Sequence, residues 1–95
     1  MNKSELVDAT QKRLDGVTRR QVETILVSVI AVIVEQVSAG NPVRLVGFGT
    51  FERRSAKKRM GRNPRTGEAI EIPARQVPAF KAGSGFKNFV REKHG

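Results

Sequence analysis

The run from Ile25 to Val34 is apolar at nine of its ten positions, and it constrains the fold more than any other segment. As a helix with 3.6 residues per turn, it would be apolar on nearly every face for about two and a half turns. A helix that is apolar all round has to be buried all round. A 95-residue chain with one other short helix and a small sheet cannot supply that cover. The run therefore predicts that a second copy of the protein covers it, with Ile30 in the shared core.

Local signals favour a helix for this run, although its many β-branched residues leave a β-strand as the alternative. Thr18 and Gln21 have the spacing of a capping box, in which each side chain bonds the backbone N–H of the other residue. Gly40 fits a helix stop, so we expect a helix from Thr18 to about Ser38. Residues 2 to 16 predict a shorter amphipathic helix ahead of it, capped by Asn2 and Glu5 and ending near Gly16.

After residue 40 the apolar period changes from that of a helix to that of a strand. Val43 and Leu45 alternate with Arg44, and glycines flank Phe48 in the next turn. We expect one α+β domain, made of a helical hairpin, a three-stranded antiparallel sheet with a long β-ribbon arm, and a short C-terminal helix. The expected segments are 1–40 for the helical dimerisation base, 41–81 for the sheet with its arm at about 53–76, and 82–95 for the last helix.

Cations are concentrated in the second half of the chain. Residues 52–95 hold 12 of the 18 basic residues and only 4 of the 9 acidic ones. Between Arg53 and Arg65 lie seven cations and no acidic residue, an arrangement that repels itself unless a polyanion neutralises it. A ribbon this polar cannot fold onto a core, so it predicts an arm that binds nucleic acid, with DNA as the favoured ligand.

Several other classes of protein lack support in the sequence. The chain has no cysteine and no phosphate-binding GxxxxGK loop, and its single histidine has no carboxylate at a spacing useful for catalysis. We therefore expect no enzyme, metal site or cofactor. The first ten residues lack the apolar core of a signal peptide, and the apolar run Val29 to Val34 is far short of a membrane span. We therefore expect a soluble cytoplasmic protein with no membrane or small-molecule partner.

Three motifs occur in a fixed order: GFGTF at Gly47 to Phe51, GRNPRTGE at Gly61 to Glu68, and VPAF at Val77 to Phe80. Together with the helix pair before them, they resemble the HU/IHF family of bacterial histone-like DNA-bending proteins, and HU most closely. The resemblance implies an interlocked homodimer whose two arms reach around duplex DNA in its minor groove. Such architectural proteins are themselves a standard example of kinking by an inserted apolar side chain.

The resemblance also implies roles for individual residues. Pro64 would be the wedge that intercalates at the arm tip, because its ring is rigid and apolar. Two positions depart from the family pattern, since Ala56 and Ser84 stand where arginine and lysine are common. The expected DNA-binding residues are Lys3, Arg53, Arg54, Lys57, Lys58, Arg59, Arg62, Asn63, Pro64, Arg65, Arg75, Lys81 and Lys87. The expected dimer core is Ile30, Phe48, Phe51 and Phe80.

The function that we expect is binding of double-stranded DNA with little sequence specificity, bending it and compacting the bacterial nucleoid. Bent, nicked or gapped DNA should bind more tightly, because part of the deformation cost is already removed. Two alternatives stay open. One is a site-specific bender like integration host factor, and the other is a cationic protein that binds RNA or a membrane surface.

Overall fold

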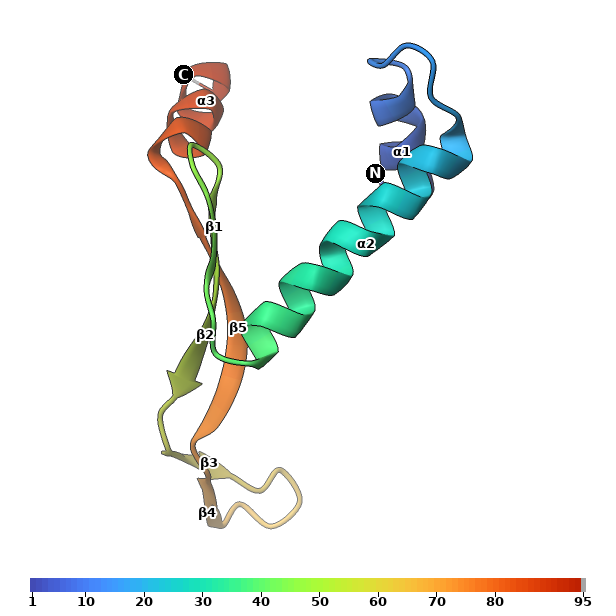
Figure 1. Cartoon of the computed structure of the whole chain (residues 1–95). Coiled ribbons are helices and arrows are strands. Elements are labelled where there is room, and N and C mark those ends of the chain that lie inside the picture. Colours follow the sequence, from blue (N-terminus) through green and yellow to red (C-terminus); the bar gives the residue numbers. More distant parts are fainter. Residues whose placement is uncertain (95) are drawn as a thin grey trace. The chain divides into compact units, whose positions relative to one another are not determined.

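The computed structural model describes residues 1–94 and forms two compact units, Met1–Glu35 and Gln36 onward (Figure 1). The expected α+β class is confirmed, and Gly95 of the predicted last segment lies outside the described residues. In chain order the elements are α1 Lys3–Gln11, α2 Arg19–Ser38, β1 Val43–Leu45, β2 Gly49–Ala56, β3 Arg59–Arg62, β4 Ala69–Ile72, β5 Arg75–Ala82 and α3 Ser84–His94.

The first helix, α1, begins as the sequence predicts but ends early. The Asn2 side chain accepts from the Glu5 backbone N–H at 2.9 Å, and the Glu5 carboxylate accepts from the Asn2 backbone at 3.3 Å. The helix ends at Gln11, not near Gly16. Arg13 and Leu14 donate to carbonyls three residues back, at 3.1 and 3.0 Å, so the chain tightens into turns before Gly16 takes a φ of 75°.

The second helix, α2, confirms the helical interpretation of the apolar run and excludes a strand there. The capping box is present: the Gln21 backbone N–H donates to Thr18 Oγ1 at 3.0 Å, and the Thr18 N–H donates to Gln21 Oε1 at 2.9 Å. Gly40, with a φ of 90°, ends the helix as expected. A capping box needs only neighbouring residues, so sequence sufficed to find it.

As a whole, α2 is long and apolar enough to cross a membrane by length and composition, with a mean hydropathy of 1.6. In the sequence, only the six residues Val29 to Val34 were compared with the length of a membrane span, and this run was too short to represent the whole helix. Core helices of soluble proteins and signal sequences pass the same test, so this property alone selects no environment.

The sheet has the strand order β1–β2–β5, with both neighbouring pairs antiparallel. Gly49 is buried beneath Phe80, and a Cβ built on Gly49 would lie 2.5 Å from that ring and 2.7 Å from the Lys81 carbonyl oxygen. Only glycine fits there, because the backbone and an aromatic ring approach on the same side. This close approach fixes Phe80 over the start of β2.

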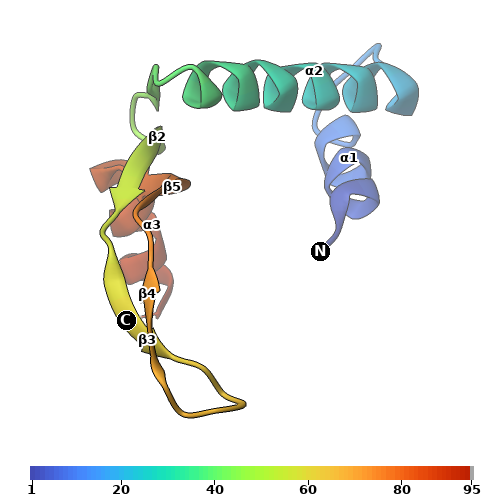
Figure 2. The same cartoon turned by 90° about the horizontal axis from the view of Figure 1, so that it is seen from below.

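The arm continues from this sheet but is interrupted. The β2–β5 pairing runs to Ala56 opposite Arg75, and a separate pairing of β3 with β4 begins at Arg59 opposite Ile72. Residues 57–58 and 73–74 lie outside both ladders, and Pro73 has no backbone N–H to contribute. Figures 1 and 2 show the two sections following one another and ending in an open loop. The expected arm is present, as two short ribbons in series.

Little of this chain is fully buried on its own. Val7, Val22 and Val37 are the buried apolar side chains among the described residues. Along α2, Leu26 and Ile33 are partly covered, and with Val22 and Val37 they form one stripe at helical spacing. Other apolar residues of α2 remain exposed: Ile25, Val27, Val29, Ile30, Val32 and Val34. One stripe is therefore covered within the chain and the remaining apolar surface is not.

Candidate nucleic-acid interface

The paired strands β2 and β5 have two chemically different faces. Side chains alternate along a strand, and directly paired residues share a face. Arg54, Arg75 and Lys81 all fall on one face, together with the partners Val77, Ala56 and Thr50. We call this the cationic face. It brings Arg54 together with cations that lie 21 and 27 residues further along the sequence, and all three side chains are exposed.

The opposite face carries the aromatic residues. Phe51 pairs with Phe80, their ring centroids 4.8 Å apart, and Ser55 bonds Gln76 at 2.7 Å. Arg53 is paired with Pro78 on this same face. We call it the aromatic face. Arg53 is thus the one expected DNA-binding cation of β2 and β5 that lies away from the cationic face.

The distal ribbon of β3 and β4 presents a second set of cations. Met60 pairs with Glu71 and Arg62 with Ala69 on one face, while Arg59 pairs with Ile72 on the other. Ile72 covers Gly61, where an added Cβ would lie 2.8 Å from its Cδ1. Arg59 and Arg62 are exposed on opposite faces, so a ligand lying against one face meets one of them directly.

The arm tip is an ordered turn around Pro64. The Asn63 backbone donates to the Glu68 carbonyl and the Gly67 N–H donates to the Asn63 carbonyl, both at 2.8 Å. The Asn63 side-chain carbonyl accepts from the Arg65 backbone at 2.9 Å, as asparagine commonly does in turns. Pro64 is exposed, and these bonds on both sides fix its direction. Asn63 therefore shapes the tip with its Oδ1, leaving its Nδ2 as the group suited to base-edge acceptors.

Acidic side chains neutralise several of the expected contacts. Lys58 Nζ lies 2.7 Å from Glu71 Oε1, and Arg54 Nη2 lies 3.4 Å from Glu52 Oε1. In the helical unit, Lys3 Nζ lies 3.7 Å from Glu23 Oε1. Sequence reasoning paired neither Glu52 nor Glu71 with a cation. The i, i+2 spacing of Glu52 and Arg54 could have revealed their ion pair. The pair of Lys58 and Glu71 could not be found in this way, because it depends on the register of the ribbon.

The remaining expected residues are placed individually. Lys3 lies at the start of α1, Lys57 in the break of the arm, Arg65 in the tip turn and Lys87 in α3, and all four are exposed. Arg53 Nη1 donates to the Ser38 carbonyl at 3.1 Å, at the end of α2. The structure thus groups most of the expected cations on the arm and its root and engages Arg53 elsewhere.

The three phenylalanines of the expected dimer core form a cluster, and Phe86, which was not among the expected core residues, joins it. The centroids of Phe48 and Phe80 are 5.2 Å apart, and Phe86 of α3 stacks on Phe48 at 5.3 Å. Phe48 and Phe80 remain 44% and 40% exposed, and Ile30 is 46% exposed. The cluster is therefore only half covered by its own chain.

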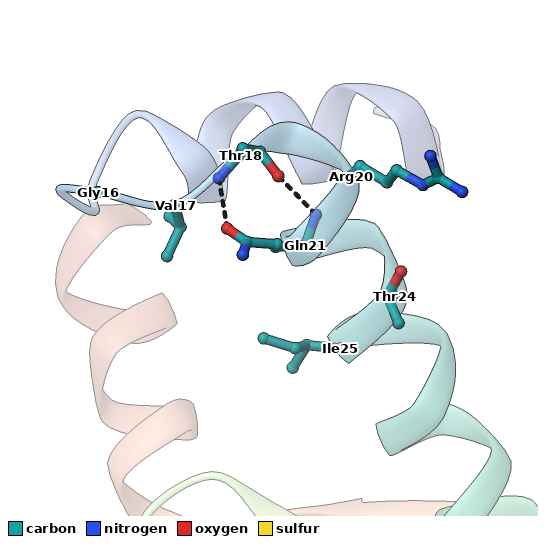
Figure 3. A pocket seen from close by; sticks show the side chains of 7 residues that line it. All are labelled: Gly16, Val17, Thr18, Arg20, Gln21, Thr24 and Ile25. Carbon is teal, nitrogen blue, oxygen red and sulfur yellow. Dashed lines mark hydrogen bonds between the residues drawn. The ribbon is translucent and has the colours of Figure 1, made fainter.

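A separate pocket of about 480 Å³ lies at the turn between α1 and α2 (Figure 3). Its walls are mainly apolar, and the capping-box bonds between Thr18 and Gln21 form part of its rim. Arg20 is the only charged residue among those that line it. Within residues 1–94, no group of three histidine, cysteine, aspartate or glutamate side chains is arranged to hold a metal ion.

Comparisons with known proteins agree with this geometry. Residues 1–91 match the family described as bacterial DNA-binding protein. The DNA-binding protein HU of Nostoc sp. is 51% identical over 90 residues, which cover 95% of each chain. That of Clostridium pasteurianum is 46% identical over 92 residues, which cover 97% of this chain and 100% of the relative.

Solved structures extend the likeness to the fold. An Anabaena HU–DNA cocrystal structure matches with a TM-score of 0.89 at 51% identity, over 95% of this chain and 97% of the other. HU from Thermotoga maritima matches with a TM-score of 0.67 at 31% identity, over 95% and 98%.

Proposed function

Since this chain belongs to the family of bacterial DNA-binding proteins that includes HU, we propose that it is an architectural protein that binds and bends duplex DNA. The observation that carries the proposal is the arm: a cation-rich ribbon whose tip holds an exposed proline. A solved relative with 51% identity, an Anabaena HU, is crystallised with DNA. The proposed contacts are the expected residues of the arm and its root other than Arg53, which lies on the aromatic face, together with Lys3 and Lys87.

Affinity would come mainly from phosphate contacts. Each cation that neutralises a phosphate releases a condensed counterion, so log affinity falls with log salt by about 0.9 per contact on B-form DNA. The cationic face supplies Arg54, Arg75 and Lys81. Arg59 and Arg62 lie on opposite faces of the distal ribbon, so both would reach phosphates where the ribbon lies in a groove between the two DNA backbones. Phosphates carry no sequence information, which supports binding with little sequence specificity.

Bending would come from Pro64. Its apolar ring stands at the tip of an ordered turn, and insertion between base pairs requires little further ordering of the chain. We place the arm in the minor groove, which a narrow ribbon can enter and where apolar wedges unstack base steps at a cost of about a few kcal/mol. DNA that is already nicked or gapped avoids part of that cost.

We further propose that the binding form is a homodimer. The exposed apolar surface of α2 and the half-covered aromatic cluster are both too extensive for a stable monomer in water. A second copy would cover both with the same surface used twice, as two-fold interfaces do. Two arms would then hold one duplex, which lets each dimer kink DNA at two points.

These properties suit compaction of the nucleoid in the bacterial cytoplasm, without catalysis. No observation favours the RNA, membrane or site-specific alternatives over duplex DNA of general sequence.

The test is a salt-matched titration of an intact duplex and the same duplex with a short central gap. We expect tenfold or greater preference for the gapped DNA, equivalent to about 1.4 kcal/mol of avoided unstacking. Pro64→Ala should reduce this preference while keeping the salt slope. Pro73→Ala, an exposed proline outside the tip, is the matched control and should keep both. Equal affinities of the parent protein for the two duplexes would refute bending by a wedge.

A further inference from the structure

Arg53 lies in the basic run but not with its neighbours. Its backbone pairs with Pro78 on the aromatic face, alongside Phe51, whereas Arg54 lies on the cationic face. Adjacent residues of a strand point to opposite sides of a sheet, so Arg53 and Arg54 cannot both contact a ligand that lies against one face.

The end of α2 is capped by backbone donors at two of its carbonyls but not at the Ser38 carbonyl. Gly40 donates to the Val37 carbonyl at 3.0 Å and Asn41 donates to the Gln36 carbonyl at 2.8 Å, which together make a Schellman motif. Among residues 1–94, no backbone N–H donates to the Ser38 carbonyl. The last turn of α2 also contains no basic residue to balance the negative end of the helix dipole.

The Arg53 guanidinium supplies what is missing. Its Nη1 donates to the Ser38 carbonyl at 3.1 Å, which places a positive charge at the negative end of the helix. Gly40 makes room for it, since a Cβ at that position would lie 3.0 Å from Arg53 Nη2. Gly40 therefore has two roles, because its φ of 90° also allows the Schellman turn to form.

We infer that Arg53 is a positioning residue that caps α2 and anchors the root of the arm to it, and that it is not a phosphate contact. The inference rests on the proposed DNA binding. It assigns Arg53 a structural role and leaves the other cations of the basic run for contact with DNA. Arg53 spans 15 residues of sequence to tie β2 to the helix end, within the β2–β5 ladder. Arg54, directly after it, lies on the cationic face, where binding of a phosphate would replace its contact with Glu52 Oε1, 3.4 Å from its Nη2.

The experiment compares Arg53→Gln with the matched neighbour Arg54→Gln in the full-length protein. Both remove one charge from the same strand, so a general loss of positive charge affects them equally. We measure the salt slope of binding to the gapped duplex and the midpoint of thermal unfolding without DNA. Arg53→Lys is included as a conservative variant that keeps the charge at the helix end.

For Arg53→Gln we expect an unchanged salt slope and an unfolding midpoint lower by about 2–5 °C. Arg53→Lys should recover part of that decrease. For Arg54→Gln we expect a slope smaller by about 0.9 for each phosphate that the side chain no longer neutralises, with a smaller change in midpoint. A slope that falls equally in Arg53→Gln and Arg54→Gln would overturn the inference.

A second measurement reports on the hydrogen bond itself. The carbonyl ¹³C resonance of Ser38 should shift in Arg53→Gln and stay in place when DNA is added to the parent protein. A Ser38 resonance insensitive to Arg53→Gln would also overturn the inference. Failure of the parent protein to bind duplex DNA would instead remove the proposed function, and the capping role would still stand on the unfolding and NMR data.

Discussion

Glu71 is expected to lower the affinity for DNA, because its carboxylate forms an ion pair with the ammonium group of Lys58. The two groups are 2.7 Å apart and their side chains are 58% and 61% exposed. An exposed pair of this kind is worth about 0.2–1 kcal/mol, and Lys58 has to leave it to reach a phosphate. Glu71→Gln removes that cost, so affinity should rise by about 1.4- to 5-fold per arm, or about 2- to 30-fold for a dimer that uses both arms.

The assay is fluorescence anisotropy with the gapped duplex at two salt concentrations. The gain should shrink as salt rises, because salt already screens the exposed pair. Glu68→Gln is the matched control. It removes the same charge three residues away, from a side chain that forms no ion pair within residues 1–94. Equal gains from the two variants would show only a general charge effect, and no gain from Glu71→Gln would refute the reasoning.

Two further predictions concern the proposed dimer core and the close packing of two glycines in the strands. Ile30→Asp should place a charge in the proposed dimer core and shift the protein to monomer or unfolded chain in analytical ultracentrifugation; an intact dimer would contradict the interface. Gly49→Ala should destabilise by about 1–3 kcal/mol in urea unfolding, because the new methyl meets the Phe80 ring and the Lys81 carbonyl. Gly61→Ala should cost less, since only the flexible end of Ile72 has to move, and equal costs would contradict this account.

The features that sequence predicted well are those built from neighbouring residues. Both capping boxes join residues three apart, so the starts of α1 and α2 followed from residue type and spacing alone. The α1 end was misplaced because no strong stop signal follows Gln11, and the early turns before Gly16 resemble a continuing helix. The break in the arm was missed as well, although Pro73 marks one side of it.

The candidate site divides in the same way. The count of cations and the tip turn were predictable, because charge and turn chemistry are local properties of the chain. The direction of Arg53 was partly predictable too, since it shares its alternation with Phe51. Its partner was not, because Ser38 is 15 residues away and offers a backbone carbonyl that residue identity does not reveal.

By itself, the sequence determined a basic arm with a proline at its tip, two capped helices, and an apolar helix that one small chain cannot cover. These follow from charge, spacing and the energetic cost of exposing apolar surface to water. Tertiary structure alone decided which cations share a face, which acids neutralise them, and that Arg53 serves the helix. Those outcomes depend on strand register, because a shift of one residue would move every side chain of the ribbon to the opposite face.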